Sequence, residues 1–353
     1  MSKTKIVRID PKQIKEEYIL EASNMLNLGG LVIVPTETVY GVAADMTSSK
    51  AIERLYEIKK RPKDKPFSIH IAKKDKVEDF ALAVPLGAYK LMNKFWPGPL
   101  TLILKSIKGS TVGLRMPDND ITLKILSLAS NPIVIPSANI SDKFPPVDFE
   151  GAIRDLDGLV DFAIDAGRIR IGIESSIVDF SKDVPEFLRI GALKKEELEQ
   201  TILKKHLLFV CTGNSCRSVM AEALFKKILQ EKNRNDVEAS SAGTIILSGI
   251  APSSGTKEVL RTEGIDVSNY LSQRITKELI RRSDLILAME RMHEEAVLRI
   301  APEAKNRVFL LKEFAGINDA NLDIVDPIGK PLEFYKKTLS SIKEAIERVS
   351  NLI

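Results

Sequence analysis

Short apolar runs alternate along the chain with longer stretches in which apolar residues recur at helical spacing, a pattern typical of α/β proteins. In the first half, the apolar runs predict strands at 31–35, 67–71, 101–105, 132–136 and 175–180. Between them, the spacing of apolar residues predicts helices at 11–27, 50–59, 85–95, 119–130 and 148–156. We therefore expect an α/β fold for this half of the chain.

A second series of strands and helices begins after residue 206. Its predicted strands are 207–210, 237–240, 284–288 and 307–311, and its predicted helices are 218–231, 255–263, 290–300 and 331–350. This alternation predicts a four-stranded, parallel, doubly wound sheet. The segment 194–205, KKEELEQTILKK, is polar and favours a short helix, so we interpret it as a linker between a domain at 1–193 and a domain at 206–353.

Composition agrees with two packed domains. The 353 residues suit two cores of common size, with 44% hydrophobic and 28% charged residues. No apolar run approaches the ~20 residues that span a membrane, and the first residues, MSKTKIVRIDPKQ, lack the hydrophobic stretch of a signal peptide. We therefore expect a cytoplasmic protein with no membrane partner. A net charge of +4 is too small to favour non-specific nucleic-acid binding.

The chain has only two cysteines, Cys211 and Cys216, which excludes a disulfide framework. The three histidines, His70, His206 and His293, are scattered without zinc-ligand spacing, so no metal site is predicted. Two thiols so close together indicate redox or nucleophilic chemistry in a cytosolic protein. Taken without their surroundings, they are equally compatible with two buried, inert cysteines.

The segment VCTGNSCRSVMAEALF carries the strongest chemical signal. Cys211 ends a predicted strand, and Gly213 and Asn214 tolerate the backbone angles of a tight loop before the next helix. Loop amides and a helix N-terminus would converge there on a phosphate-like dianion, and this field favours a thiolate. Arg217 adds a forked donor for phosphate, and Asp326, beside Pro327, offers a carboxylic acid for a leaving group.

This segment resembles the signature of the low-molecular-weight protein phosphatases, as do SAG (241–243), SQR (272–274), DLILAM (284–289), LKEF (311–314) and DPIG (326–329). The resemblance implies a phosphorylated protein as substrate, Cys211 as the residue that becomes phosphorylated, Arg217 as the phosphoryl-binding group and Asp326 as acid and then base. It implies that further loop residues support the cradle: Thr212, Gly213, Asn214, Ser215, Cys216 and Ser218. Cys216 would also form a reversible protective disulfide on oxidation. Val219 stands where many members have proline.

Two positions bear on the substrate of this half. Ile328 and Gly329 follow the Asp-Pro pair, where tyrosine-directed members supply aromatic residues. Ser215 is a small hydroxyl residue, and the similar protein-arginine phosphatases have threonine there. We therefore expect phosphoarginine in proteins to be favoured. The alternatives are a tyrosine phosphatase and a cysteine redox sensor; an arsenate reductase is disfavoured because no cysteine follows Cys216.

The first half contains neither a Walker loop nor a G-x-G-x-x-G turn after a strand. Small polar loops follow its apolar runs instead: PTETVYG (35–41), KKRPKDKPFSIH (59–70), FWPGPLT (95–101), RMP (115–117), PSANIS (136–141) and GIESS (172–176). From the residues alone, these loops could line an anion-binding cleft. A solvated surface loop is the simpler explanation of the Lys/Arg cluster taken by itself.

The order of these segments, ending in LRIGA (188–192), resembles the YrdC-like L-threonylcarbamoyladenylate synthases across about 10–193. The resemblance implies a twisted, open α/β sheet and the condensation of L-threonine, bicarbonate and ATP into threonylcarbamoyl-AMP, which downstream machinery uses to modify tRNA. It implies ATP contacts from Lys59, Arg61, Arg115, Ser137, Asn139 and Arg189, and threonine contacts from Thr36, His70 and Ser175, with Tyr40 nearby. Mg²⁺ is expected with ATP, without a tightly bound cofactor. The alternative is a non-catalytic RNA-binding module.

Overall fold

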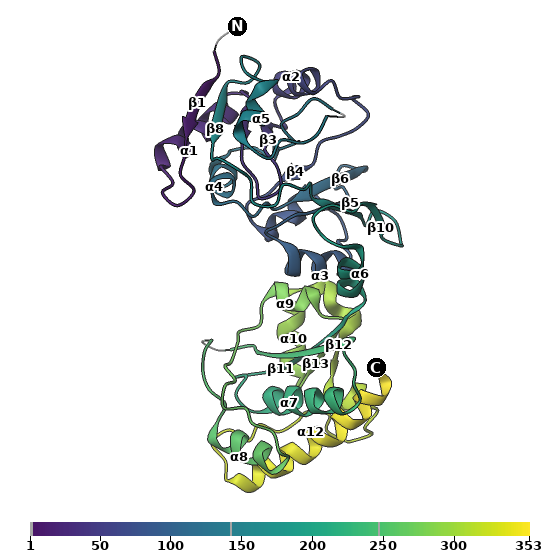
Figure 1. Ribbon diagram of the computed structural model, residues 1–353. Helices are drawn as coiled ribbons and strands as arrows, with labels where there is room; N and C mark the ends of the chain where they lie inside the picture. Colours follow the sequence, from purple (N-terminus) through teal and green to yellow (C-terminus); the bar gives the residue numbers. More distant parts are fainter. Residues whose placement is uncertain (1–2, 142, 246–247) are drawn as a thin grey trace. The chain divides into compact units, whose positions relative to one another are not determined.

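The computed structural model describes residues 3–141, 143–245 and 248–353 (Figure 1). The chain divides into two compact units, Met1–Thr201 and Ile202–Ile353. The helix α6 (Lys195–Leu203) spans the point of division, within the segment that the sequence predicted as a linker. Among the residues described, no helix is both long and apolar enough to cross a membrane.

Ten strands within the described part of the first unit form one mixed sheet, in the order β1-β8-β2-β3-β7-β4-β6-β5-β9-β10. Four neighbouring pairs are parallel and five are antiparallel. The strands are β1 (Lys5–Arg8), β2 (Val32–Val34), β3 (Gly41–Asp45), β4 (Ile69–His70), β5 (Leu100–Lys105), β6 (Thr111–Arg115), β7 (Ile133–Val134), β8 (Phe162–Asp165), β9 (Ser176–Asp179) and β10 (Glu186–Arg189). The predicted open α/β sheet is confirmed.

The helices of the first unit begin where the sequence offers a cap or a break. Ser48, Asn119 and Asp148 each accept a backbone N–H three residues ahead, and each therefore starts a helix. The helices are α1 (Glu16–Asn27), α2 (Ser49–Lys59), α3 (Leu86–Phe95), α4 (Asp120–Leu128) and α5 (Phe149–Arg154), with a 3₁₀ turn at η1 (Lys74–Asp79). All five helices coincide with predicted ones.

Half of the strands in this sheet escaped the sequence prediction: β1, β3, β6, β8 and β10. Strand β3, GVAAD, is entirely buried although glycine and alanine have little intrinsic preference for strands. Gly41 approaches Ile135 so closely that an added Cβ would overlap that side chain. Pairing with β2 and β7 therefore determines β3, and residue preference does not.

The second unit has a parallel sheet in the order β12-β11-β13-β14, as predicted. Its strands are β11 (Lys205–Cys211), β12 (Val237–Gly243), β13 (Leu285–Ala288) and β14 (Val308–Leu310). Its helices are α7 (Arg217–Glu231), α8 (Ser254–Thr262), α9 (Lys277–Arg282), α10 (Arg291–Ile300), α11 (Leu311–Phe314) and α12 (Leu332–Leu352), with a 3₁₀ turn at η2 (Pro302–Arg307). The strand order reverses between β11 and β13, which is where open α/β sheets bind ligands.

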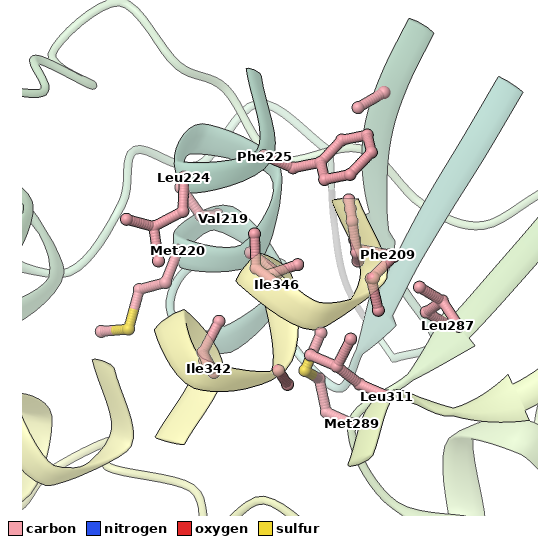
Figure 2. Close-up of a cluster of buried hydrophobic side chains, with 14 of the residues drawn as sticks. Phe209, Val219, Met220, Leu224, Phe225, Leu287, Met289, Leu311, Ile342 and Ile346 are labelled. Atoms are coloured by element: carbon pink, nitrogen blue, oxygen red, sulfur yellow. The ribbon is translucent and has the colours of Figure 1, made fainter. Parts of the chain in front are cut away.

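Alternation along β11 separates two hydrophobic layers. Leu207 and Phe209 face α7, α8 and α12, whereas Leu208 and Val210 face α9 and α10. Figure 2 shows the first layer, with residues of α7 and α12 packed against β11 and β13. Phe209 and Phe225 meet edge to face with ring centroids 5.8 Å apart. This layer fixes the start of α7 against the end of β11.

We expect Phe225→Ala to lower the free energy of unfolding of the second unit by about 3–5 kcal/mol, because it leaves a cavity in this layer. Thermal unfolding of the full chain followed by calorimetry measures the effect as a shift of one transition. The control is Phe334→Ala, since Phe334 is 44% exposed on α12. Equal shifts in the two variants would contradict this description of the core.

Candidate functional site

The loop between β11 and α7 is shaped by one buried asparagine. Asn214 has a positive φ of 44°. Its amide nitrogen donates to the Ser218 and Ser241 hydroxyls at 2.9 and 2.8 Å. Its amide oxygen accepts from the Tyr270 hydroxyl at 3.0 Å and the Gln273 N–H at 2.8 Å. Every hydrogen-bonding position of the amide is used, and these contacts stabilise an otherwise costly backbone conformation.

This loop holds Cys211 almost completely out of contact with water, at 2% exposure. The Ser218 Oγ lies 2.9 Å from the Cys211 Sγ, and the Asn214 N–H donates to the same sulfur at 3.3 Å. Both groups can donate to a thiolate, and the sulfur lies just before the N-terminus of α7. The arrangement suits a nucleophilic sulfur.

Arg217 is the most buried charged side chain of this site, at 1% exposure. One terminal nitrogen donates to the Ile324 carbonyl and lies 2.8 Å from a Glu290 carboxylate oxygen. The other donates to Asp326 at 2.6 Å and to the Thr212 hydroxyl at 3.3 Å. Within the described part of the chain its buried Nε–H has no acceptor. The guanidinium therefore keeps one donor for an anion even while Asp326 occupies another.

Asp326 joins the predicted cluster through this ion pair. Its side chain is 34% exposed, and its second oxygen accepts from the Ile328 N–H at 3.1 Å. The structure thus brings Arg217 and Asp326 into contact, while the loop connects them to Cys211. Cys216 is buried and unbridged, with its sulfur 3.2 Å from the Ser253 hydroxyl.

Sequence reasoning missed four polar residues around this loop: Ser241, Tyr270, Glu290 and His293. The His293 Nε2 lies 2.8 Å from the Thr212 Oγ1 and 3.6 Å from a Glu290 oxygen. Burial, and then the charge of Arg217, lowers the pKa of His293 to about 4. Glu290 and His293 follow β13, so the rule that ligands bind at the carboxyl ends of parallel strands could have found them.

In the first unit, the nine predicted site residues line two cavities. The first cavity, of about 150 Å³, is lined by Thr36, Arg61, His70, Arg115, Ser137, Ser175 and Arg189, among others. The second, of about 460 Å³, is lined by Lys59, Arg61, Ser137 and Asn139, among others. Arg61, Ser137 and Glu174 line both cavities, which therefore adjoin.

Two residues that line the first cavity each have a buried polar atom without a partner among the described residues, His70 Nε2 and Arg115 Nε. The His70 Nδ1 lies 3.2 Å from the Ser68 carbonyl, which can only accept. The proton is thus on Nδ1, and Nε2 is an acceptor. Burial, and then the charge of Arg115, lowers the pKa of His70 to about 3. An acceptor and a cationic donor therefore line one small cavity.

Hydroxyl groups and a second arginine complete the wall of this cavity. The Thr36 hydroxyl donates to the Val39 carbonyl at 2.6 Å. The Ser175 hydroxyl lies 2.9 Å from the Thr101 hydroxyl and accepts from Arg189 at 3.2 Å. Arg189 also donates to the Ser175 carbonyl at 2.9 Å. These contacts fix the start of β9 and the end of β10 against the start of β5.

Glu37 and Glu174 each pair with an arginine that was predicted for the site, although neither glutamate was predicted as a site residue. Arg115 pairs with Glu37 at 2.7 Å, and Arg189 pairs with Glu174 at 2.7 Å. Both glutamates stand inside quoted motifs, PTETVYG and GIESS, which is the signal that could have identified them.

Lys59 lies at the base of the second cavity and is 2% exposed. Its ammonium donates to the carbonyls of Ser137 and Asn139 at 2.5 and 2.7 Å. Burial, and then the charge of Arg61, lowers the pKa of Lys59 to about 8. Arg61 itself lies over the Phe67 ring, with its guanidinium carbon 5.2 Å from the ring centroid. Lys59 thus holds the loop that lines both cavities, and Arg61 is the more accessible cation.

No group of three or more His, Cys, Asp or Glu residues suited to a metal ion occurs in the described ranges of either unit.

Comparison with known proteins assigns each unit separately. Residues 24–191 match the Sua5/YciO/YrdC family model, described as telomere recombination, and residues 206–352 match the low-molecular-weight phosphotyrosine protein phosphatase model. Over 206 residues the chain is 34% identical to a relative from Methanocaldococcus jannaschii. The match covers 97% of that relative and 56% of this chain. It is 39% identical over 144 residues to the protein-arginine-phosphatase of Geobacillus stearothermophilus, covering 93% of that protein and 41% of this chain. The chain belongs to both families.

Two further likenesses concern the Sua5/YciO/YrdC unit. The chain is 41% identical over 200 residues to the threonylcarbamoyl-AMP synthase of Pyrococcus abyssi, a match that covers 54% of this chain and 59% of that enzyme. The chain therefore spans little more than half the length of that relative. The solved structure of Pyrococcus abyssi Sua5 complexed with L-threonine is similar with a TM-score of 0.53 and 25% identity, covering 97% of each chain. The membership in both families that the sequence motifs indicated is confirmed.

The lowered pKa of His70 predicts that the Sua5/YciO/YrdC unit loses folding stability at acidic pH. As the pH falls from about 6.5, the unfolded chain binds a proton that the folded unit rejects until about pH 3. Stability contributed by the neutral ring is thus present above about pH 6.5 and is lost as the pH falls, at ~1.4 kcal/mol per unit of pKa difference.

His70→Gln removes this titration, so the unfolding free energy of the variant should fall less steeply between pH 6.5 and 4 than that of the wild type. Calorimetry of the full chain across this range measures the slope, and Phe225→Ala identifies the transition of the other unit. Parallel slopes in wild type and variant would show that His70 is not buried in its neutral form.

Proposed function

We propose that the chain is a bifunctional enzyme. The first unit makes threonylcarbamoyl-AMP from L-threonine, bicarbonate and ATP, and the second unit hydrolyses phosphorylated protein. The observation that supports the first activity is the pair of adjoining cavities lined by all nine expected residues. The observation that supports the second is a buried cysteine on a cradle that also carries an arginine and a carboxylate.

We assign threonine to the smaller cavity. A threonine amine must be uncharged to attack the carbon of bicarbonate or of CO₂ derived from it. The His70 Nε2, neutral near pH 7, accepts an amine N–H without adding charge, and the Arg115 Nε–H suits a carboxylate or the new carbamate. The similarity to a Sua5 solved with L-threonine supports this assignment. So small a cavity suits an amino acid better than an RNA backbone, which disfavours the RNA-binding alternative.

The larger cavity then receives ATP. The carbamate oxygen attacks the α-phosphorus, and the bond to the β-phosphate oxygen breaks to release pyrophosphate. Arg61 and Lys143 line this cavity and stabilise the departing charge, while Lys59 keeps the Ser137–Asn139 loop in position. Among the described residues that line the cavity, Glu174 is the one carboxylate, and Arg189 holds one of its oxygens. Mg²⁺ would therefore be bound mainly through the phosphates of ATP.

The product carries an acyl-phosphate anhydride and so is an activated threonylcarbamoyl donor. We propose that it supplies the modification of tRNA adenosine through downstream transfer machinery. ATP and tRNA are both cytoplasmic, which supports a cytoplasmic location.

In the second unit, the Cys211 sulfur attacks phosphorus and forms a phosphocysteine while the substrate heteroatom leaves. Asp326 protonates that leaving atom and then accepts a proton from the water that attacks the phosphocysteine. The phosphoryl group replaces Asp326 on Arg217, which presents its Nε–H as well. Binding therefore frees the acid that the first step requires.

The choice of phosphoarginine rests on two residues. Ile328 is exposed beside Asp326, so no aromatic wall follows the Asp-Pro pair. Ser215 places a hydroxyl on the cradle, where it can hydrogen bond to a guanidinium or to the attacking water. Similarity to a protein-arginine-phosphatase supports this choice over phosphotyrosine.

Arg61→Ala should lower threonine-dependent release of pyrophosphate by about 100-fold, because it removes charge that faces the phosphates. Lys59→Ala should also reduce turnover, because the loop that lines both cavities loses its support. Lys63→Ala is the matched control, since Lys63 is an exposed cation of the same segment that lines neither cavity. Near-normal turnover in both Arg61→Ala and Lys59→Ala would refute the assignment of the synthase site.

Wild-type protein should have a higher kcat/KM for a phosphoarginine peptide than for a matched phosphotyrosine peptide. Ser215→Ile should shift this ratio toward phosphotyrosine by about tenfold, which is ~1.4 kcal/mol. Cys211→Ser is the control and should abolish hydrolysis of both the phosphoarginine and the phosphotyrosine peptide. A wild-type preference for phosphotyrosine would defeat the phosphoarginine assignment.

A further inference from the structure

Five large aliphatic side chains of the phosphatase unit are exposed on segments that surround the cradle. They form what we call the aliphatic rim: Ile245, Ile250, Leu271, Val325 and Ile328. Each is roughly half to two-thirds exposed, from 49% for Ile250 to 68% for Ile245. They make up five of the nine large hydrophobic residues that are exposed in the described part of this unit. Such clustering distinguishes the rim from the scattered apolar residues of an ordinary surface.

The first rim segment is hydrogen bonded directly to the cradle. The Thr244 N–H donates to the Cys211 carbonyl at 3.0 Å, and the Ile245 N–H donates to the Thr212 carbonyl at 3.1 Å. Ile245 is therefore hydrogen bonded directly to Thr212, the residue that follows the proposed nucleophile.

The other segments are fixed to the cradle in the same way. The Gln273 N–H donates to the Asn214 side chain at 2.8 Å, and the Ser272 N–H donates to the Ile250 carbonyl at 2.9 Å, which links the segments of Leu271 and Ile250. Arg217 donates to the Ile324 carbonyl, directly before Val325. Every rim residue thus lies close in sequence to a residue that is hydrogen bonded to the loop that holds Cys211.

The first rim segment also lacks the charge that keeps surfaces hydrated. The sequence 244–252, TIILSGIAP, contains no charged residue. Exposed apolar side chains such as those of Ile245 and Ile250 gain nothing from solvent unless another apolar surface covers them. When a phosphorylated residue of a polypeptide reaches Cys211, its flanking residues lie over the segments that are bonded to the cradle, so a polypeptide substrate is the surface that can meet the rim.

We propose that the aliphatic rim binds apolar side chains next to the phosphorylated residue of a polypeptide substrate. The proposal rests on the phosphatase activity proposed above and adds the class of sequence that the enzyme prefers. A free phosphorylated amino acid or a sugar phosphate would leave the rim in water and would gain nothing from it. A phosphorylated residue flanked by leucine or valine would bury the rim and bind more tightly.

The test compares two phosphopeptides that differ only in whether leucine and valine or serine and glutamine flank the phosphorylated residue, together with p-nitrophenyl phosphate. The full chain should have a kcat/KM about tenfold higher for the apolar-flanked peptide, with the difference mainly in KM. Ile250→Ser with Leu271→Ser should remove the preference while leaving hydrolysis of p-nitrophenyl phosphate unchanged. Leu352→Ser is the matched control, since Leu352 is 64% exposed and Leu271 is 62% exposed.

Equal kcat/KM for the two peptides overturns the proposal. So does a loss on p-nitrophenyl phosphate as large as the loss on the peptides, because the double variant then acts on the cradle and not on flanking residues. If the rim is a contact between two copies of this chain, sedimentation will show a dimer that the double variant abolishes, without any preference between peptides. Failure of the wild type to hydrolyse even p-nitrophenyl phosphate would instead defeat the proposed phosphatase activity.

Discussion

In both units the loops that face the ligand leave the ends of buried strands, where their peptide groups lose water and need other partners. A buried polar side chain supplies those partners in each unit. In the phosphatase unit the Asn214 amide ties its own strained loop to Ser218, Ser241 and Tyr270. In the synthase unit the Lys59 ammonium holds two loop carbonyls, those of Ser137 and Asn139. The sites depend on these buried supports, because the loops contain too few apolar residues to be held by packing.

The sequence motifs predicted which residues line the cavities better than they predicted the position of each residue within them. The pattern of Lys59 and Arg61 predicted two equivalent phosphate contacts, but the structure buries Lys59 under a loop and leaves Arg61 partly exposed. Helix α2 ends at Lys59 and Lys60 has a left-handed backbone, so the chain turns between residues 59 and 61, which a motif does not express. Similarly, Arg115 was grouped with ATP and lines the smaller cavity alongside His70.

The phosphatase fold could be predicted from the sequence almost completely, because three of its four strands are largely apolar runs and its sheet is parallel throughout. The synthase sheet was predicted only in part. Strand β8 pairs only with strands far away in the chain, and β3 has one such partner, β7, besides its close neighbour β2. The residues of both strands carry no local signal strong enough to reveal them. His293 and Tyr270 were not predicted as site residues for a related reason. Their roles depend on contacts with Thr212 and Asn214, which lie 81 and 56 positions away in the chain.

Burial has opposite consequences for the cations of the two sites. A lysine can lose its proton when it is desolvated, and the pKa of Lys59 accordingly falls to about 8, so it retains its charge near neutral pH but by a small margin. An arginine cannot lose its proton in a protein, so Arg217 must be neutralised by partners instead. Asp326 and Glu290 do this in the phosphatase unit. In the mechanism proposed above, a phosphoryl dianion takes over the role of Asp326. The ion pair that stabilises the buried arginine is then also the one that substrate binding exchanges, and the released carboxyl group is the proposed acid.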